Sequence, residues 1–475
     1  MIRLIAKSIR SALHRRPSQG RPYPRVAPAH PLLKNAAAFG RDPYRFMIEG
    51  QRQYGDFYDV HLPHVPLFVL SKPEYAKHVL VTNNKKYEKS FAYEFLRHPL
   101  GNGLLTSEGD FWLKQRRIAQ PAFHRERLAA LATTITTTTQ EMLSTWEEHA
   151  RASRPVNATH DLMQLTSRVV ARALFGSDVA DSASDIVRYI NTINQHVTEK
   201  VSNPFHFSLG PLSRKQRAYE QALRELDTIV YGIIGHRHRS GKTYHDLLAM
   251  LMETEDEDTG ERMSDRQVRD EVVTLFIAGT ETSAVALSWA LYLLARHPRE
   301  AANVCEEANQ TRSETPRAED AAQLEQTNRV LQEAMRLYPP AWVIGRQARE
   351  EDELDGYFIP RGAQVYVCPS IIHRHPDLWE QPEQFWPDRF SSERVKRRHK
   401  FAFFPFGGGP RYCIGNHFAM MEMQLVLSLI IKKFDIKLDG EGEVPVEPLI
   451  TLRPLGGISP RLIQRSNQPR EISVS

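Results

Sequence analysis

Apolar and polar residues recur along most of this chain with the period of an α-helix. The clearest case follows Ser264, where Gln267 completes a capping box, a common start signal of a helix. Apolar residues then continue through DEVVTLFIAGTETSAVALSWALYLLAR and end before Pro298, which favours a helix end at the preceding residue. The pattern predicts a helix of about 32 residues, roughly 48 Å long. Because apolar residues cover nearly its whole circumference, we expect it to run through the middle of the protein.

Strand-like patterns stand out in two short regions. Residues 53–70 contain short apolar runs interrupted by Pro63 and Pro66, which predicts a hairpin. Residues 356–367 contain GYFIP and AQVYV on either side of Arg361 and Gly362, which predicts a second pair of strands. The sequence shows no internal repeat and no linker between independent units. It therefore predicts a mainly α-helical fold with a small β lobe, built as a single large domain.

The two ends of the chain differ from its middle. Residues 1–35 are basic and rich in proline, and no acidic residue precedes Asp42. The apolar positions of MIRLIAKSIRSALHRR share one helical face, which fits a membrane-surface helix or a mitochondrial targeting peptide. A frayed basic tail is the alternative. We expect the folded domain to span residues 36–465 and a C-terminal tail to span residues 466–475.

Composition narrows the classes of function. The 475 residues carry 62 Lys and Arg against 57 Asp and Glu, and this net charge of +5 does not favour nucleic acid as a partner. The 3 cysteines exclude a disulfide scaffold and favour a reducing compartment. We therefore expect a cytoplasmic protein with peripheral membrane contact as an option, and mitochondrial targeting stays open. A run of about 18 apolar residues, which would predict a membrane-spanning helix, does not occur.

The strongest chemical signal is the segment FAFFPFGGGPRYCIGNHFAMMEMQLVLSLI around Cys413. Its glycines allow backbone N–H groups to approach the sulfur closely. A helix that begins near Asn416 directs its positive end at a thiolate, which lowers the pKa of a cysteine. Arg411 offers a fixed cation to an anionic ligand. A structural cysteine is the simpler reading of a lone Cys, but the spacing F-x-x-G-x-R-x-C-x-G arises by chance on the order of once in ten thousand such chains.

This spacing, present at Phe406, Gly409, Arg411, Cys413 and Gly415, resembles the signature of the cytochrome P450 family. The resemblance implies a triangular, mostly helical prism with a smaller β-rich lobe. It also implies haem b (iron protoporphyrin IX) as cofactor, with Cys413 as the axial ligand of the iron. Phe406, Arg411 and Gly415 would belong to the cofactor-binding loop.

Other cofactors fit the sequence less well. His373 and His375 form a His-x-His pair, but a matching second pair of zinc ligands does not accompany it. No glycine-rich phosphate loop follows a predicted strand, so a bound nucleotide or flavin is unsupported. The resemblance then implies that electrons come from NAD(P)H through a separate ferredoxin or flavodoxin and its reductase.

Two further segments resemble the family's catalytic and structural features. The resemblance makes residues 278–283, AGTETS, the oxygen-binding kink of the long helix, where Thr282 supplies a hydroxyl and Glu281 relays protons. It makes Glu333, Arg336 and Arg389 a structural ion-pair network that braces the cysteine loop from behind.

A third set of residues is suited to the haem propionates. Trp112 and Arg116 are four residues apart, which places an indole N–H and a guanidinium on one helix face. Arg346 and Arg411 are the remaining propionate partners by their positions in the family pattern.

The resemblance implies a haem-thiolate monooxygenase that inserts one oxygen atom from O2 into a hydrophobic small molecule, by hydroxylation or epoxidation. Residues 91–105 and 197–226 would cap the pocket. By family position the pocket wall is formed by Phe276, Ile277, Ala278, Trp342, Val343 and Ile450.

Residues 394–400 form a basic run that could serve as a docking surface for the electron donor. The basic side chains Arg394, Lys396, Arg397, Arg398 and Lys400 would attract an acidic electron donor, whereas a solubilising turn is the alternative. We expect a monomer. A peroxide-driven or isomerising enzyme of the same fold, and a non-catalytic haem sensor or electron carrier, are the rival functions.

Overall fold

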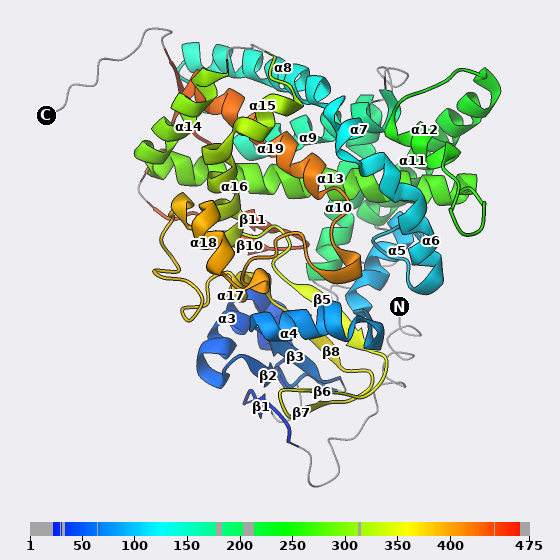
Figure 1. The fold of residues 1–475 in the computed structure, drawn as a ribbon, viewed down its shortest axis with the longest axis vertical. Coiled ribbons are helices and arrows are strands. Elements are labelled where there is room, and N and C mark those ends of the chain that lie inside the picture. The colour runs from blue at the N-terminus through cyan, green and yellow to red at the C-terminus, as the bar shows by residue number, and fades with distance from the viewer. Residues whose placement is uncertain are drawn as a thin grey trace, which may run out of the picture.

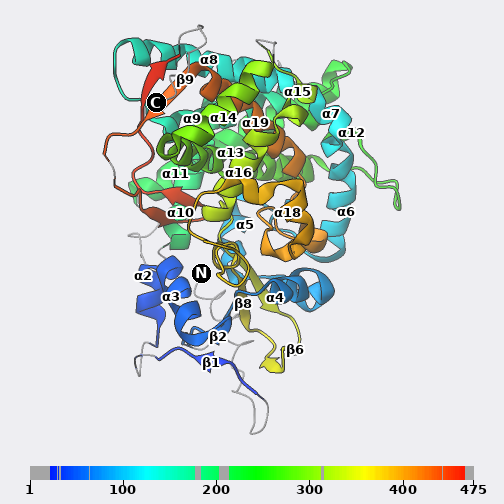
Figure 2. The same cartoon turned by 60° about the vertical axis from the view of Figure 1, so that its left-hand side comes forward.

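The computed structural model describes residues 22–465 apart from 29, 31–33, 64, 177–182, 203–212, 312–314 and 441. Helices form the broad part of the molecule, and most strands gather at its narrower end (Figures 1 and 2). The helix expected near the N-terminus and the C-terminal tail lie outside the described residues, as does part of the predicted cap at 197–226. The mainly helical fold with a small β lobe is confirmed.

Most of the described residues lie in helices, which differ widely in length. The longer helices are α3 (Pro43–Tyr54), α6 (Gly109–Ala119), α8 (Ala132–Arg151), α9 (Ala158–Phe175), α10 (Ala183–Ser202), α11 (Arg214–Ser240), α13 (Asp265–Arg296), α14 (Pro298–Gln310), α16 (Glu325–Leu337) and α19 (Asn416–Lys433). The shorter ones are α2 (Ala36–Arg41), α4 (Pro73–Lys77), η1 (His78–Thr82), η2 (Asn84–Lys86), η3 (Phe91–Tyr93), α5 (Glu94–Leu100), η4 (Gln120–Phe123), α7 (Arg125–Ala129), α12 (Leu247–Glu253), α15 (Ala318–Gln323), α17 (Pro369–Ile372), η6 (Pro387–Phe390), α18 (Ser392–Arg397), η7 (Lys400–Ala402) and η8 (Gly409–Arg411).

Helix α13 is the predicted central helix, and its bounds match the expectation. Ser264 caps it, and the Ser264 and Gln267 side chains complete the predicted capping box. The helix runs through the middle of the helical part (Figure 1), where it contacts α9, α16 and α19. It is the one described helix long and apolar enough to cross a membrane, but 72% of its most apolar stretch is buried in the protein. Burial by its neighbours thus accounts for its apolar circumference.

The strands form one larger sheet and three short pairs in the described part of the chain. The strands are β1 (Arg25–Val26), β2 (Phe57–Asp59), β3 (Leu67–Leu70), β4 (Tyr87–Lys89), β5 (Ile344–Ala348), β6 (Asp352–Leu354), β7 (Tyr357–Ile359), β8 (Gln364–Val367), β9 (Phe434–Lys437), β10 (Val446–Pro448), β11 (Leu452–Pro454) and β12 (Arg461–Gln464). The six-stranded sheet has the order β1-β2-β3-β8-β5-β4, and the pairs are β10-β11, β12-β9 and β6-β7.

One predicted hairpin is confirmed and the other pairing is wrong. Strands β2 and β3 pair antiparallel, as the pattern at 53–70 predicts. Strands β7 and β8 both exist but do not pair with each other, because β7 pairs with β6 and β8 joins β3 and β5. Asp355 and Gly356 both have positive φ, at 53° and 79°, and so form the tight turn that directs β7 back onto β6.

A buried carboxylate fastens the β6–β7 hairpin to the chain before it. The Asp352 side chain accepts hydrogen bonds from His78 Nε2 at 2.7 Å, Tyr87 Oη at 2.7 Å and Lys86 Nζ at 3.0 Å. Burial, the largest influence, raises the pKa of Asp352, but hydrogen bonds from His78, Tyr87, Lys86 and Asn83 outweigh it and hold the pKa below its usual value.

Asp352→Asn is expected to lower the free energy of unfolding by about 2–3 kcal/mol at pH 7, because it removes hydrogen bonds to a charged group. Since the folded-state pKa is depressed, the stabilisation is present above the unfolded pKa of about 3.9 and is lost as pH falls below it. The free energy of unfolding is measured by urea unfolding followed by circular dichroism. The difference in this free energy between variant and wild type should be constant between about pH 7 and 5 and should become smaller toward about pH 3.5.

The exposed Asp439, which pairs with Arg461, offers a matched control. Asp439→Asn should change stability by less than about 1 kcal/mol. Equal losses in the two variants would contradict the central place of Asp352 in this lobe.

Candidate functional site

Cys413 lies in the short connection between η8 and α19 and is half-buried. Its backbone N–H donates to Phe406 O at 3.0 Å, which closes the loop on itself. Gly407 and Gly409 have φ of 74° and 68°, and a Cβ on Gly409 would lie only 1.8 Å from Leu80 O. A side chain at Gly409 is therefore excluded by the backbone of η1. Glycine is needed here for the close approach of two chain segments rather than for access to the sulfur.

The pKa of the Cys413 thiol departs from the sequence-based expectation. Burial raises it above the usual value of a cysteine, and neither the Gly415 N–H nor the positive charge of Arg116 reverses the direction. The predicted lowering is therefore wrong for the free thiol, because desolvation of the thiolate exceeds the help from the helix start. A bound metal cation would supply the missing stabilisation of the thiolate.

Helix α13 has an open stripe in the middle of its otherwise buried length. Leu275, Ala278 and Thr282 are spaced by three and four residues and so share one face. Ala278 is exposed and the other two are half-buried, whereas Ala284 and the residues that follow it are buried as far as Leu294. Thr282 Oγ1 donates to Ala278 O at 2.7 Å, although α13 stays α-helical through this stretch. The stripe leaves room beside the helix for a ligand, and Leu275 is a member that the sequence analysis missed.

Two of the residues expected in the pocket wall are almost fully buried among core side chains. Phe276 is 1% exposed and packs in the helical core, since it lies on a different face of α13 from the open stripe. Trp342 packs in the core of the small lobe, where its Nε1 donates to Leu449 O at 2.9 Å. Of the other expected wall residues, Ile277, Val343 and Ile450 are half-buried and Ala278 is exposed. Gly279 serves the crossing with α9, because a Cβ there would lie 3.0 Å from Val170 Cγ2.

Positive side chains gather around Trp112. The Arg411 guanidinium lies 3.7 Å from the centre of the Trp112 ring, donates to Ser107 O and pairs with Glu108. Arg346, half-buried on β5, donates to Gly345 O. Arg116, one turn along α6 from Trp112, donates to Tyr412 O at 3.0 Å, next to the cysteine in the chain.

Lys89 and Arg97 extend this positive cluster, and the sequence analysis did not name them. Burial and then Arg411 lower the pKa of Lys89 to about 6, and Arg346 and Arg97 act in the same direction. Arg97 Nε is buried without a hydrogen-bond partner. Cations that depress one another's charge in this way favour an anionic ligand. No periodicity marks Lys89 or Arg97, so the sequence alone offered no signal for them.

The two residues of the expected proton relay differ in environment. Glu281 is 4% exposed, and its Oε1 forms an ion pair with Arg453 Nη2 at 2.7 Å. Thr282 lies next to it on the open stripe. Arg453, on β11, is a further residue that the sequence analysis missed, because it follows Glu281 by 172 residues.

The three residues of the expected ion-pair network are brought together. Arg336 Nε and Nη2 donate to the two Glu333 oxygens at 2.7 and 2.8 Å, and Arg389 Nε reaches Glu333 Oε1 at 3.3 Å. Arg336 Nη1 also donates to His373 O at 3.0 Å. His373 Nε2 in turn accepts from the backbone N–H of Phe404, which leads into the cysteine loop. A continuous path of hydrogen bonds therefore joins α16 to the segment before Cys413.

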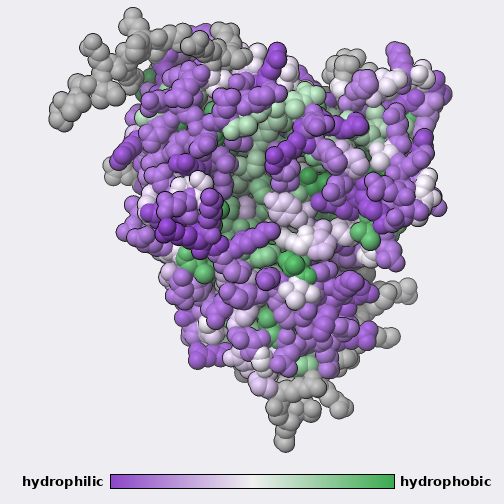
Figure 3. Space-filling model, viewed as in Figure 1, coloured by the Kyte–Doolittle hydropathy of each residue, from purple (hydrophilic) through white to green (hydrophobic). Residues whose placement is uncertain are grey.

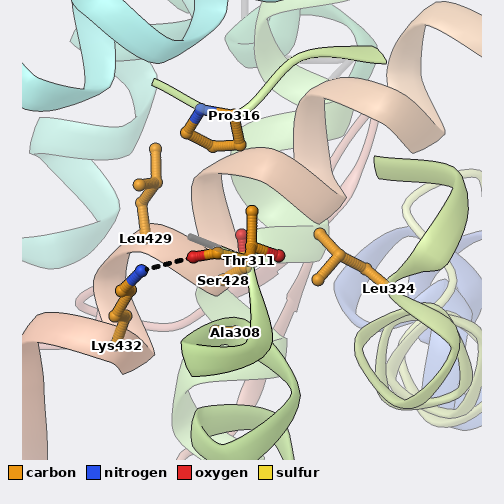
Figure 4. A pocket seen from close by; sticks show the side chains of 7 residues that line it. All are labelled: Ala308, Thr311, Pro316, Leu324, Ser428, Leu429 and Lys432. Atoms are coloured by element: carbon orange, nitrogen blue, oxygen red, sulfur yellow. Dashed lines mark hydrogen bonds between the residues drawn. The ribbon is translucent and has the colours of Figure 1, made fainter. Parts of the chain in front are cut away.

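Other candidate sites in the structure are weaker. The small pocket in Figure 4 lies between α14 and the C-terminal end of α19, and Lys432 Nζ donates across it to Thr311 O at 2.9 Å. This pocket lies at the end of α19 opposite to Cys413, which precedes the start of that helix. Within the described residues, no group of three or more His, Cys, Asp or Glu side chains is placed to bind a metal.

Comparison with known proteins identifies the family. The family model for cytochrome P450 matches residues 24–458. The chain belongs to the cytochrome P450 family. It is 34% identical to the cyclooctatin synthase of Streptomyces melanosporofaciens over 87% of this chain and 90% of that protein. It is 30% identical to the pentalenene oxygenase of Streptomyces avermitilis over 89% of this chain and 93% of that protein.

The fold comparison agrees with the family. The crystal structure of the cytochrome P450DA heme domain superimposes with a TM-score of 0.85 at 26% identity, covering 94% of this chain and 98% of that one. The protein is accordingly a cytochrome P450 monooxygenase with haem as its cofactor. The open stripe on α13, the half-buried Cys413 and the positive cluster with an unpartnered Arg97 Nε all fit a flat, metal-bearing group with two carboxylates.

Glu333→Ala or Arg336→Ala is expected to yield protein without bound haem. Removing one partner leaves a buried charge unpaired, at a cost of about 3–5 kcal/mol, and breaks the path from α16 to the cysteine loop. Haem absorbance per mole of purified protein is the measurement, with circular dichroism to verify that the helices remain.

Arg329 on the same helix offers the control, because its pair with the exposed Glu325 is a solvated one at 3.4 Å. Arg329→Ala should keep wild-type haem content. Normal haem content in either network variant would refute the bracing role.

Proposed function

We propose that this cytochrome P450 holds haem b through Cys413 and oxygenates a terpenoid substrate with electrons from a separate redox protein. The glycine-bounded loop that holds the half-buried Cys413 carries this proposal. The reaction balances when R–H, O2, two electrons and two protons yield R–OH and water. Haem supplies oxygen activation when it is bound, and a thiolate ligand favours cleavage of the O–O bond.

The residues of this chain then divide into three roles. Lys89, Arg97, Arg346 and Arg411, with the Trp112 indole, would bind the two propionates by charge-assisted hydrogen bonds. Thr282 would hold a proton at its Oγ1 beside the reacting centre, and Glu281 would pass protons to it from water. Ile277, Ala278, Val343 and Ile450, together with Leu275, would form an apolar wall that excludes water from the substrate.

The relatives favour terpenoids among hydrophobic substrates. The names of two of them refer to cyclooctatin and pentalenene, and both proteins match this chain over nearly their whole length. The open stripe on α13 presents Leu275 and Ala278, which are small or aliphatic and carry no charge. A carbon-rich polycyclic molecule suits such a wall, since its recognition rests on the burial of apolar surface.

The proposal is tested first by the thiolate–haem signature. The reduced protein with carbon monoxide should show the red-shifted Soret band of a thiolate complex, and Cys413→Ala should abolish it. Cys305→Ala, the same change at another buried cysteine, should retain it. A wild-type preparation that takes up no haem would overturn the proposal.

Substrate class and reaction type are tested with the same preparation. Pentalenene should shift the haem to the high-spin state at lower concentration than hexadecanoic acid does. The reverse order would reject the terpenoid assignment. Turnover with hydrogen peroxide alone, and none with O2 and a reduced ferredoxin, would establish the peroxide-driven alternative instead.

A basic surface around α18 supports docking of an acidic electron donor. Figure 3 shows the face that carries α18 and α19, where the strongly hydrophilic α18 region borders an apolar area. Arg394, Lys396 and Lys400 are exposed, and Arg394 stacks 4.4 Å above the Trp386 ring. Two members of the predicted basic run are engaged within the protein. Arg397 pairs with Glu393 at 2.9 Å, and the half-buried Arg398 donates to Arg389 O.

The double variant Arg394→Glu with Lys396→Glu should slow reduction of the haem by a plant-type ferredoxin at least tenfold at low salt. Reversing charges at a docking surface lowers the association rate, and salt screens what attraction remains. Stopped-flow absorbance of the carbon monoxide complex measures the rate. Arg224→Glu, at an exposed position on α11 outside this surface, should reduce at the wild-type rate. Salt-independent kinetics in the wild type would contradict the docking role.

A further inference from the structure

The carboxylate of Glu281 is held at only one of its two oxygens. Oε1 accepts hydrogen bonds from Arg453 Nε at 2.8 Å and from Thr451 Oγ1, and it forms an ion pair with Arg453 Nη2 at 2.7 Å. In the part of the chain that the structure describes, Oε2 accepts no hydrogen bond. Three donor atoms therefore converge on one oxygen, and the second is left for a different partner.

A purely structural ion pair in the same protein has a different geometry. Arg336 uses two nitrogens on two oxygens of Glu333, and both side chains are fully buried. This forked arrangement is the usual strong pairing of arginine with a carboxylate. Arg453 instead places both nitrogens on Oε1 of Glu281, and the Arg453 side chain is 26% exposed. The Glu281 pair thus gives up one strong contact and stays close to solvent.

The two donors to Glu281 come from a hairpin that is itself fixed in place. Strands β10 and β11 pair antiparallel, and Thr451 lies in the connection between them. Trp289 Nε1 on α13 donates to Leu452 O at 2.8 Å, and Leu452 N donates to Pro340 O at 3.1 Å. The hairpin therefore has little freedom to move away from α13. Arg453 and Thr451 hold their geometry toward Glu281 without relying on the ion pair alone.

We propose that Arg453 and Thr451 are positioning residues for the proton relay of this cytochrome P450, clamping Glu281 Oε1 so that Oε2 exchanges protons with water. The inference rests on the proposed relay role of Glu281 and assigns its control to the β10–β11 hairpin. The relay adds no reactant: Glu281 takes a proton from water at Oε2 and releases it toward Thr282, and both protons consumed in the reaction still come from solvent.

Arg453 is the only charged side chain paired with Glu281 among the described residues. Loss of the Arg453 guanidinium would therefore leave Thr451 as the only donor to Glu281 Oε1 in the described part of the chain.

The test uses haem-loaded full-length protein with NADPH, a plant-type ferredoxin and its reductase, and no organic substrate. Oxygen uptake and hydrogen peroxide release are measured together, because four electrons and four protons per O2 give water whereas two of each give peroxide. Arg453→Gln should raise the share of oxygen that is released as peroxide, because Glu281 loses the side chain that orients it. Arg453→Lys, which keeps the charge, should return that share toward the wild-type value.

A double-mutant comparison separates positioning from structure. If Arg453 acts through Glu281, the variant with Arg453→Gln and Glu281→Gln should behave as Glu281→Gln alone does. Additive losses would overturn the inference. Thr451→Val provides a second test, in case Arg453→Gln unfolds, and should also raise the share of peroxide. An unchanged peroxide share in Thr451→Val would also contradict the clamp.

Arg461→Gln on β12, which breaks an exposed pair with Asp439, is the matched control and should leave both readouts unchanged. The proposed function has a separate readout in the wild type. A thiolate–carbon monoxide band with no wild-type oxygen uptake would reject the monooxygenase assignment, whereas normal uptake with additive variants would reject only the clamp.

Discussion

The burial of α13 on nearly all sides is the constraint on which the rest of this structure depends. A helix of 32 residues with an apolar circumference is stable in water only if other elements cover it. Helices α9, α16 and α19 provide that cover. Positions on α13 that are not covered, or that are buried but charged, therefore indicate where a functional site lies. Leu275, Ala278 and Thr282 lie open on one face, and Glu281 is a buried carboxylate that needs a partner.

Two buried carboxylates illustrate how the same chemistry serves different ends in one chain. Glu333 receives a forked pair of hydrogen bonds from Arg336, a further one from Arg389 and one from the Trp386 backbone. Both Glu333 oxygens therefore accept hydrogen bonds, which suits a rigid brace. Glu281 has all its donors on one oxygen and a partner that reaches solvent. An incompletely satisfied carboxylate is the better carrier of a proton.

The positive cluster near Trp112 contains more cations than anions. After burial, Arg411, Arg346 and Arg97 lower the pKa of Lys89, and Glu108 opposes them. Such an excess of positive charge in a partly buried place is unfavourable by itself, because each cation depresses the charge of its neighbours. An anionic cofactor would relieve it. In the proposed function, the positive cluster would bind the carboxylates of the cofactor and Cys413 would bind its metal.

The sequence by itself determined the features that depend on neighbouring residues. The capping box at Ser264, the hairpin at 53–70 and the glycine-bounded Cys413 loop are local patterns, and the structure has each of them where it was expected. The grouping of Glu333, Arg336 and Arg389 was also foreseen, although through family resemblance rather than through any pattern in the residues.

Only the tertiary structure decided the features that join distant segments. The sequence could not show that β8 pairs with β3 and β5, that Lys89 and Arg97 lie near Arg411, or that Arg453 holds Glu281. It also predicted the wrong direction for the pKa of the Cys413 thiol, because helix position is a local property whereas burial is set by the whole fold. Capping and periodicity act over a few residues, but strand pairing, desolvation and ion pairing depend on which segments the core brings together.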